Sequence, residues 1–247
     1  IAITFIFLGL NIYAKSAEFV WSDISNNTKI GLQNPIFLFP KESGFTVYSI
    51  EKGGSQVFAP EIIYISKFDS EGNKQSTEEL LLPQRQRKDA TLLKVIEGED
   101  KLYFFSYVAV KKDQKNVLYA QVYDNNSNEL SEITEIATIP IEKVNNSGFF
   151  QVQISEDKSK IAVLINKPFE KKSKEKIEVL ILDSNLNTIS QSNYTLSFNS
   201  ERAYTEELFV ENDETITIIK KTDIFKKEPI TTAVTIKNNE LSTQTIS

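Results

Sequence analysis

Two Asp/Asn-rich stretches carry the side chains best suited to binding chemistry. In "DNNSNE" and "DSNLNT", oxygen-bearing side chains recur at alternate positions. The six residues are Asp124, Asn126, Asn128, Asp183, Asn185 and Asn187. This spacing opens a calcium loop, in which a hard cation collects six to eight oxygen ligands.

A tight turn between strands explains the same residues. Asp and Asn tolerate left-handed backbone, and their side chains bond nearby backbone amides. Both stretches lack the glycine that a calcium loop carries at its sixth position. Glu135 supplies an acid at the twelfth position after Asp124, but Tyr194 stands there after Asp183. We therefore expect turns, with calcium as the alternative, and we expect no other metal and no cofactor.

Lysine is concentrated in three longer polar connections between apolar runs. The residues proposed for binding are Lys111, Lys112, Lys115, Lys171, Lys172, Lys174, Lys226 and Lys227. Together they predict a face for an anionic partner such as an acidic glycan, a lipid headgroup or an acidic protein. The alternative is that they only keep exposed hairpin tips in solution. Glu170, Glu175 and Glu228 interrupt the patch.

Three pairs of neighbouring carboxylates are candidates for acid/base catalysis in a glycosidase. They are Glu78-Glu79, Glu99-Asp100 and Glu206-Glu207. All three stand at turns or strand edges, which indicates solvated charge. The basic stretch Gln84–Arg87 is expected to be an exposed linker, with a binding role as its alternative.

The composition excludes several classes of function. The 247 residues include no Cys, so there is neither a disulfide framework nor a catalytic thiolate. They include no His, which removes the usual imidazole base and the commonest zinc ligand. The net charge of −6 argues against nucleic-acid binding, which needs a dominant positive field.

The elements that must position these residues are strands. Beyond the first residues, β-branched and aromatic residues alternate with polar ones in short runs separated by turn residues. The best helical candidate, Thr77 to Leu82, is short and is followed by Pro83. Asp69, Asp124 and Asp183 each close an apolar run, and Lys237 takes the same place in a fourth copy. The period is about 56 residues, which matches a four-stranded propeller blade.

We therefore predict an all-β, β-propeller-like domain of about four four-stranded blades over residues 18–247. The repeats are 35–83, 90–140, 148–198 and 204–247. The connections between second and third strands, including the lysine clusters, emerge on one rim, and the Asp/Asn turns emerge on the other. The ring is either closed, open or truncated. Two β-sandwiches are the alternative fold, which would make the period a coincidence.

Before the repeats, the sequence predicts export. An apolar run from Ile1 to Tyr13 precedes small residues and resembles the core and cleavage region of a secretory signal peptide, so residues 1–17 are set apart. A buried element or a retained membrane anchor is the alternative. The next segment, Glu18 to Ser25, carries the only Trp and is expected to complete a sheet as an added strand.

Three segments resemble a family. "SEDKSKIAVLIN", "VLILDSNLNTIS" and "ELFVENDETITIIKK" are similar to blades of secreted β-propeller-like repeat proteins of Bacteroidota-type bacteria. The matches are turns: Ser155 to Asp157, Asp183 to Asn187, and Val210 to Thr215, where Glu214 replaces a usual glycine. The resemblance implies architecture only, because the matching motifs are turns.

The sequence leads to three hypotheses for function. The first is an exported, non-enzymatic binding module in the periplasm or at the cell surface, with a protein or glycan of the cell envelope as partner. It predicts no nucleic-acid partner and no stable membrane insertion once the signal is removed. The second is a carboxylate-dependent glycan hydrolase or lyase on the same scaffold. The third is a structural fragment of a larger surface protein.

Overall fold

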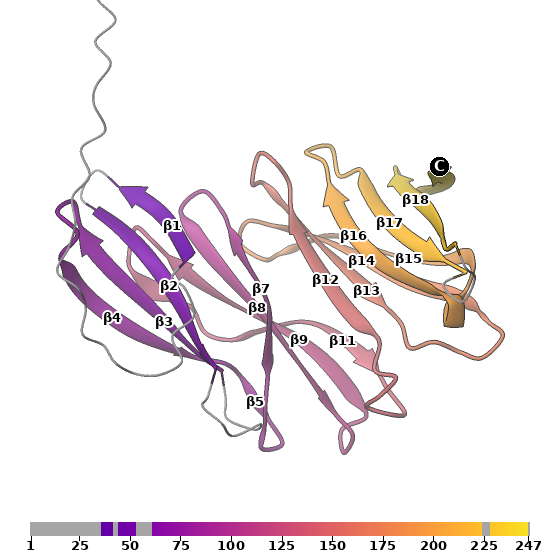
Figure 1. Ribbon diagram of the computed structural model, residues 1–247, viewed down its shortest axis with the longest axis horizontal. Coiled ribbons are helices and arrows are strands. Elements are labelled where there is room, and N and C mark those ends of the chain that lie inside the picture. The colour runs from indigo at the N-terminus through magenta and orange to yellow at the C-terminus, as the bar shows by residue number, and fades with distance from the viewer. Residues whose placement is uncertain (1–35, 42–43, 53–60, 224–227, 247) are drawn as a thin grey trace, which may run out of the picture.

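The computed structural model describes residues 36–41, 44–52, 61–223 and 228–246 (Figure 1). Side chains are described for 44–50, 62–223 and 228–246. The expected signal segment 1–17, the expected added strand Glu18–Ser25, and Lys226 and Lys227 lie outside the described residues. No described helix is long and apolar enough to cross a membrane.

The described residues form four antiparallel sheets in sequence order, each built from neighbouring strands, and one two-stranded sheet between the first two. The first two blades, with the β5–β6 hairpin between them, comprise β1 (Ile36–Lys41), β2 (Gly44–Lys52), β3 (Glu61–Asp69), β4 (Lys74–Leu81), β5 (Gln84–Arg85), β6 (Lys88–Asp89), β7 (Thr91–Glu97), β8 (Lys101–Val110), β9 (Lys115–Asp124), β10 (Glu129–Leu130) and β11 (Thr134–Pro140). The last two comprise β12 (Phe149–Ile154), β13 (Lys160–Asn166), β14 (Lys174–Asp183), β15 (Thr188–Asn199), the 3₁₀ turn η1 (Ser200–Arg202), β16 (Ala203–Val210), β17 (Ile216–Thr222), β18 (Ile230–Lys237) and β19 (Glu240–Ile246). The predicted all-β, four-bladed architecture is confirmed, and four separate sheets replace the alternative of two sandwiches.

One local expectation differs from the structure. Thr77 to Leu81 of the helical candidate lie in strand β4, because tertiary pairing with β3 outweighs a short helical pattern. The fourth strand of the second blade is divided into β10 and β11, which both pair with β9. The strand is interrupted at Ser131, whose hydroxyl accepts a hydrogen bond from the Val122 amide.

Apolar side chains hold neighbouring blades together, since a single sheet cannot bury both of its faces. One cluster joins the first and second blades around Ile63, Leu102 and Phe104. A second joins the middle blades around Phe105 and Val163, and a third joins the last two blades around Leu164, Val179 and Ile218. No such cluster of described residues joins the fourth blade to the first.

The four blades therefore form an open row. Figure 1 shows the first blade (β1 to β4) at one end and the fourth (β16 to β18) at the other. The second strand of the third blade, β13, is buried on both faces from Ile161 to Asn166. The equivalent strand of the fourth blade, β17, alternates buried and half-buried residues. This difference arises because no described blade covers the outer face of β17.

Left-handed backbone occurs where the turns require it. Glu214, which stands where the resembling family has glycine, has φ 67° in the turn between β16 and β17. Asn128 and Leu186 adopt similar values, φ 60° and φ 64°, in the Asp/Asn turns. Non-glycine residues adopt this conformation at a cost, so the turns are imposed by the strands on either side.

Candidate functional site

The Asp/Asn turns use their oxygens within the turn. The Asp183 carboxylate accepts hydrogen bonds from the Asn185 and Asn187 amides at 2.8 and 2.9 Å, and from the Asn187 side-chain amide at 3.0 Å. The pKa of Asp183 is lowered, chiefly by the Asn187 side chain and then by the turn amides. Asp124 accepts from the Asn126 and Ser127 amides at 2.8 and 3.0 Å.

These turns also contact the neighbouring blade. The Lys101 ammonium donates to the Asn185 side-chain oxygen at 2.7 Å, and the Tyr103 hydroxyl donates to the Ser184 carbonyl at 2.7 Å. Within the described residues no three Asp or Glu side chains gather as metal ligands would. The contacts favour turns that link blades, and the calcium alternative stays a prediction.

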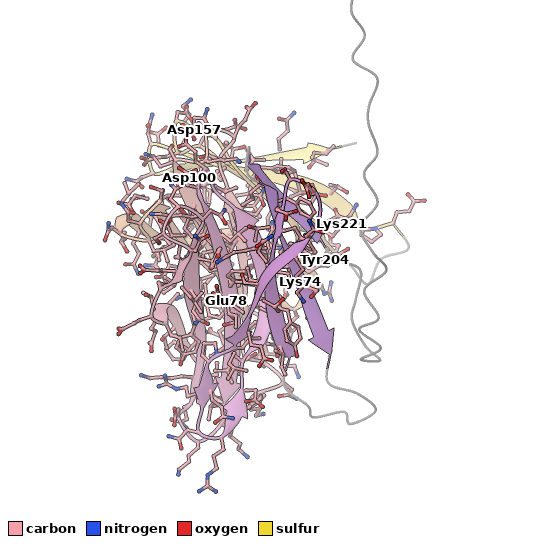
Figure 2. All side chains as sticks on the ribbon, turned by 90° about the vertical axis from the view of Figure 1, so that its left-hand side faces the viewer. Lys74, Glu78, Asp100, Asp157, Tyr204 and Lys221 are labelled. Carbon is pink, nitrogen blue, oxygen red and sulfur yellow. The ribbon has the colours of Figure 1, made fainter. Side chains whose placement is uncertain are left out.

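The lysine clusters lie at the opposite rim. Lys111 and Lys112 lie in the connection from β8 to β9, and Lys115 is the first residue of β9. Lys171 and Lys172 lie in the connection from β13 to β14, and Lys174 is the first residue of β14. Figure 2 shows Asp100 and Asp157 at one end of the blades, while many nitrogen-tipped side chains gather at the other end. We call these two loops (residues 111–115 and 167–174), together with the linkers bonded to them (82–90 and 141–148), the basic rim.

Hydrogen bonds join the basic rim into one surface. The Ile141 amide, which follows β11, donates to the Gln114 carbonyl at 2.8 Å. The side chain of Asn146, in the same linker, bonds the backbone of Phe169. The Ser200 amide in η1 donates to the Ser173 carbonyl at 3.0 Å. Each loop of the rim is therefore fixed to the linker that leads into the next blade.

Three of the acids interleaved with the lysines are already paired with other cations. Asp113 accepts from the Arg85 guanidinium at 2.7 Å, in the hairpin of β5 and β6. Glu170 pairs with the Lys176 ammonium at 2.9 Å. Glu175 pairs at 2.5 Å with the buried Lys220 of the neighbouring blade. These acids do not neutralise the exposed lysines.

Eight basic side chains of the rim make no ion pair with any described residue. They are Arg87, Lys111, Lys112, Lys115, Lys143, Lys171, Lys172 and Lys174. Lys143 was missed from the sequence, because a lone lysine in the linker "EKVNNSG" carries no signal. Its place on the rim follows only from the packing of that linker against the loop from β13 to β14.

The first strands of the last three blades line a groove, which we call the inner groove. It has a volume of about 440 Å³ between β7, β12 and β16. Its polar lining includes Lys94, Gln151, Gln153, Glu206 and Glu207. The Lys94 ammonium donates to the Val152 carbonyl at 3.1 Å and to the Gln153 side chain at 2.5 Å. Burial lowers the pKa of Lys94.

A β-bulge brings two carboxylates into the inner groove. Thr205 and Glu207 pair with consecutive residues of β17, which leaves Glu206 unpaired. A bulge interrupts the alternation of faces, so Glu206 and Glu207 are both exposed between the buried Thr205 and Leu208. The other two acidic pairs are separate from this groove: Glu78 bonds Lys67 at 3.0 Å across β3 and β4, and Glu99-Asp100 lies in a turn.

Comparison with known proteins shows likeness in fold only. No family model matches the sequence, and no curated protein matches it. The β-propeller domain of the Trilobed protease from Pyrococcus furiosus, described as having an open velcro topology, superposes with TM-score 0.48 at 11% identity, covering 87% of this chain and 56% of that chain. The acylaminoacyl peptidase of Pyrococcus horikoshii superposes with TM-score 0.50 at 11% identity, covering 88% and 33%.

An endo-arabinase from Bacteroides thetaiotaomicron is a third similar structure, with TM-score 0.44, 12% identity and coverage of 89% and 82%. The chain thus spans about half of the propeller domain and a third of the peptidase. The β-propeller character of the fold is supported. The neighbours include enzymes, but identities this low carry no activity over to this chain.

Proposed function

We propose that this protein is a non-enzymatic binding module that holds an anionic polymer on its basic rim. One observation supports the proposal above all: the rim's interleaved acids Asp113, Glu170 and Glu175 are each paired with another cation. Eight exposed basic side chains of the rim are therefore left without an ion pair among the described residues, although the chain as a whole carries −6. A field of this kind attracts and orients an anionic partner.

The extent of the rim favours a polymer over a small anion. Single exposed charge pairs contribute little, about 0 to 1 kcal/mol each. A chain of anionic units that contacts both loops and their linkers gains from many such pairs at once, because binding the first unit holds the next at high effective concentration. The loops are pre-ordered by their backbone bonds, which reduces the entropy lost on binding.

Binding by charge-reversal variants tests the proposal. We expect Lys111→Glu with Lys112→Glu to weaken binding to sodium polyphosphate and to oligogalacturonate at least about tenfold, a loss of about 1.4 kcal/mol. Lys74→Glu with Lys160→Glu is the matched control, since it makes the same change of charge at the opposite rim. Equal losses in the two double variants would show a general charge effect and contradict a site on the basic rim.

We also propose that the protein works in the periplasm or at the cell surface. The support is the apolar run and small residues of segment 1–17, together with turns that resemble secreted repeat proteins of Bacteroidota-type bacteria. Fractionation of cells that express the gene, followed by N-terminal sequencing of the product, tests this. A cytoplasmic product that keeps Ile1 to Ala17 would contradict it.

The inner groove supports a second candidate, a carboxylate-dependent glycan hydrolase or lyase. The supporting observation is the bulge that turns Glu206 and Glu207 to the same exposed side. Such an enzyme usually raises the pKa of its acid by burial, whereas both of these carboxylates are exposed. If glycan cleavage were detected and abolished by Glu207→Gln, this candidate would replace the first. The third hypothesis, a fragment of a larger surface protein, stays a prediction.

A further inference from the structure

A hollow in the basic rim is lined by an aromatic ring and by charged side chains of both signs. It encloses about 640 Å³ between the linker that follows β11 and the loop from β13 to β14. Its lining includes Lys143, Phe169, Lys171 and Glu142. This volume lies within the range of ligand pockets, about 300 to 1,000 Å³. We call it the rim hollow.

An aromatic side chain is fixed at the rim hollow. Phe169 is 50% exposed. Its backbone is held on both sides by one residue, because the Asn146 side-chain oxygen accepts from the Phe169 amide at 3.0 Å and the Asn146 side-chain amide donates to the Phe169 carbonyl at 3.0 Å. The adjacent Glu170 is held as well, since its carbonyl accepts from the Ser200 hydroxyl at 2.9 Å. The loop thus presents an apolar ring from a backbone fixed to two linkers.

The charges around Phe169 are of two kinds. Lys167 pairs with Glu178 and Lys176 pairs with Glu170, so these two ammoniums are occupied. Lys143 and Lys171 make no ion pair with any described residue. Glu142 likewise has no ion pair among the described residues, and its carboxylate accepts hydrogen bonds only.

We propose that the rim hollow binds one acidic sugar unit of a polysaccharide, a ring that carries a carboxylate. This inference rests on the proposed function and names its ligand class. The apolar C–H face of a sugar ring packs on an aromatic face, which Phe169 supplies. Lys143 and Lys171 attract the carboxylate, and Glu142 accepts from the sugar hydroxyls. A polyphosphate fits less well, since it has no apolar face for Phe169 and no hydroxyl groups along the chain to donate to Glu142.

Selectivity between two polyanions tests this assignment. We expect the Kd of the wild-type protein for decameric oligogalacturonate to be at least about tenfold lower than its Kd for polyphosphate of equal charge. Phe169→Ala should abolish that preference while leaving polyphosphate binding unchanged. Phe169→Trp keeps an aromatic face and should retain the preference. Methyl-esterified oligogalacturonate lacks the charge, so neither the wild type nor the Phe169→Ala variant should bind it.

The control separates the rim hollow from other exposed aromatic sites. Phe209 is 42% exposed and lies in the inner groove, so Phe209→Ala should leave the preference intact. An unchanged preference in Phe169→Ala, or no preference in the wild type, would overturn the sugar assignment. If Lys111→Glu with Lys112→Glu still weakens both polyanions in that case, the proposed function stands alone. If that double variant weakens neither, the proposed function fails.

Discussion

At the scale of single residues, the ammonium of Lys220 stands out among the described residues because it is fully buried. Its side chain is fully buried between the last two blades, where it donates to Glu175 at 2.5 Å and to the Thr205 hydroxyl at 2.9 Å. Burial lowers the pKa of Lys220, and Glu175 opposes that effect. The third blade has Ile165 at the equivalent position of its second strand, so an apolar residue fits this place in the fold.

Removing one partner of this pair should be costly. We expect Lys220→Ala to lower the free energy of unfolding by about 3 to 5 kcal/mol, because it leaves the Glu175 carboxylate buried without a counter-charge. Replacing both partners, Lys220→Ile with Glu175→Gln, should recover most of that loss. Urea unfolding monitored by the near-ultraviolet signal measures both. A Lys220→Ala variant as stable as the wild type would show that the pair contributes nothing.

The backbone of Glu214 supplies a prediction of the opposite sign. Its φ of 67° strains a side chain that bears Cβ, while glycine adopts this conformation freely. We expect Glu214→Gly to raise the free energy of unfolding by a net value of about 0.5 to 1 kcal/mol. The greater freedom of glycine in the unfolded chain offsets part of the gain from relieving the strain. Glu156→Gly is the control, because this turn residue has no positive φ. Equal effects of the two substitutions on the urea midpoint would argue against strain at Glu214.

At the scale of elements, the turns at the rim opposite the basic rim are small carboxylate-centred units. Asp124, Asp183 and Asp213 each accept from backbone amides of their own turn. The pKa of each is lowered, that of Asp213 to about 2, by hydrogen bonds from Thr215 and Lys237. These turns set which strands pair, and the strands in turn set the positions of the loops on the opposite rim.

Stability should therefore fall in acid. A carboxylate with a lowered pKa in the folded protein stabilises it above the unfolded pKa, near 3.9, and loses that effect as the pH falls through the folded pKa. We expect the urea midpoint to decrease between about pH 4 and pH 2. Asp183→Asn keeps an oxygen acceptor but does not titrate, so its midpoint should depend less on pH in this range. A midpoint independent of pH below 4 would contradict the role of these carboxylates.

At the scale of the whole molecule, each blade is stabilised by its neighbours. The last two blades share a cluster that buries Val179 and Ile181 of β14 against β17 and β18. At the equivalent positions on the outer face of the fourth blade stand Ala233 and Thr235, which are only half-buried. A face that no described blade covers needs to be more polar to remain in solution, and β-branched Thr meets that need without weakening the strand.

Removal of the fourth blade should expose the third. We expect the chain ending at Asn199 to aggregate or to bind a hydrophobic dye, because Leu164, Val179 and Ile181 lose their cover. Val179→Thr with Ile181→Thr should restore solubility to this shortened chain by giving it a more polar outer face. Light scattering and dye fluorescence measure both. A shortened chain that is monomeric and binds no dye without these substitutions would show that the blades do not depend on each other.

The amino-acid sequence by itself determined the repeat, the strands and the turns. These features are local: alternation with period two selects strands, and Asp183 with Asn187 closes a hairpin through bonds over four residues. It also placed the lysines of the loops on one rim, because antiparallel pairing sends alternate connections to opposite ends. The tertiary structure alone decided which rim charges are paired and where the rim hollow lies. Asp113 meets Arg85, Glu175 meets Lys220 and Asn146 meets Phe169 only when separate hairpins, linkers and blades pack together, and no local pattern records such contacts.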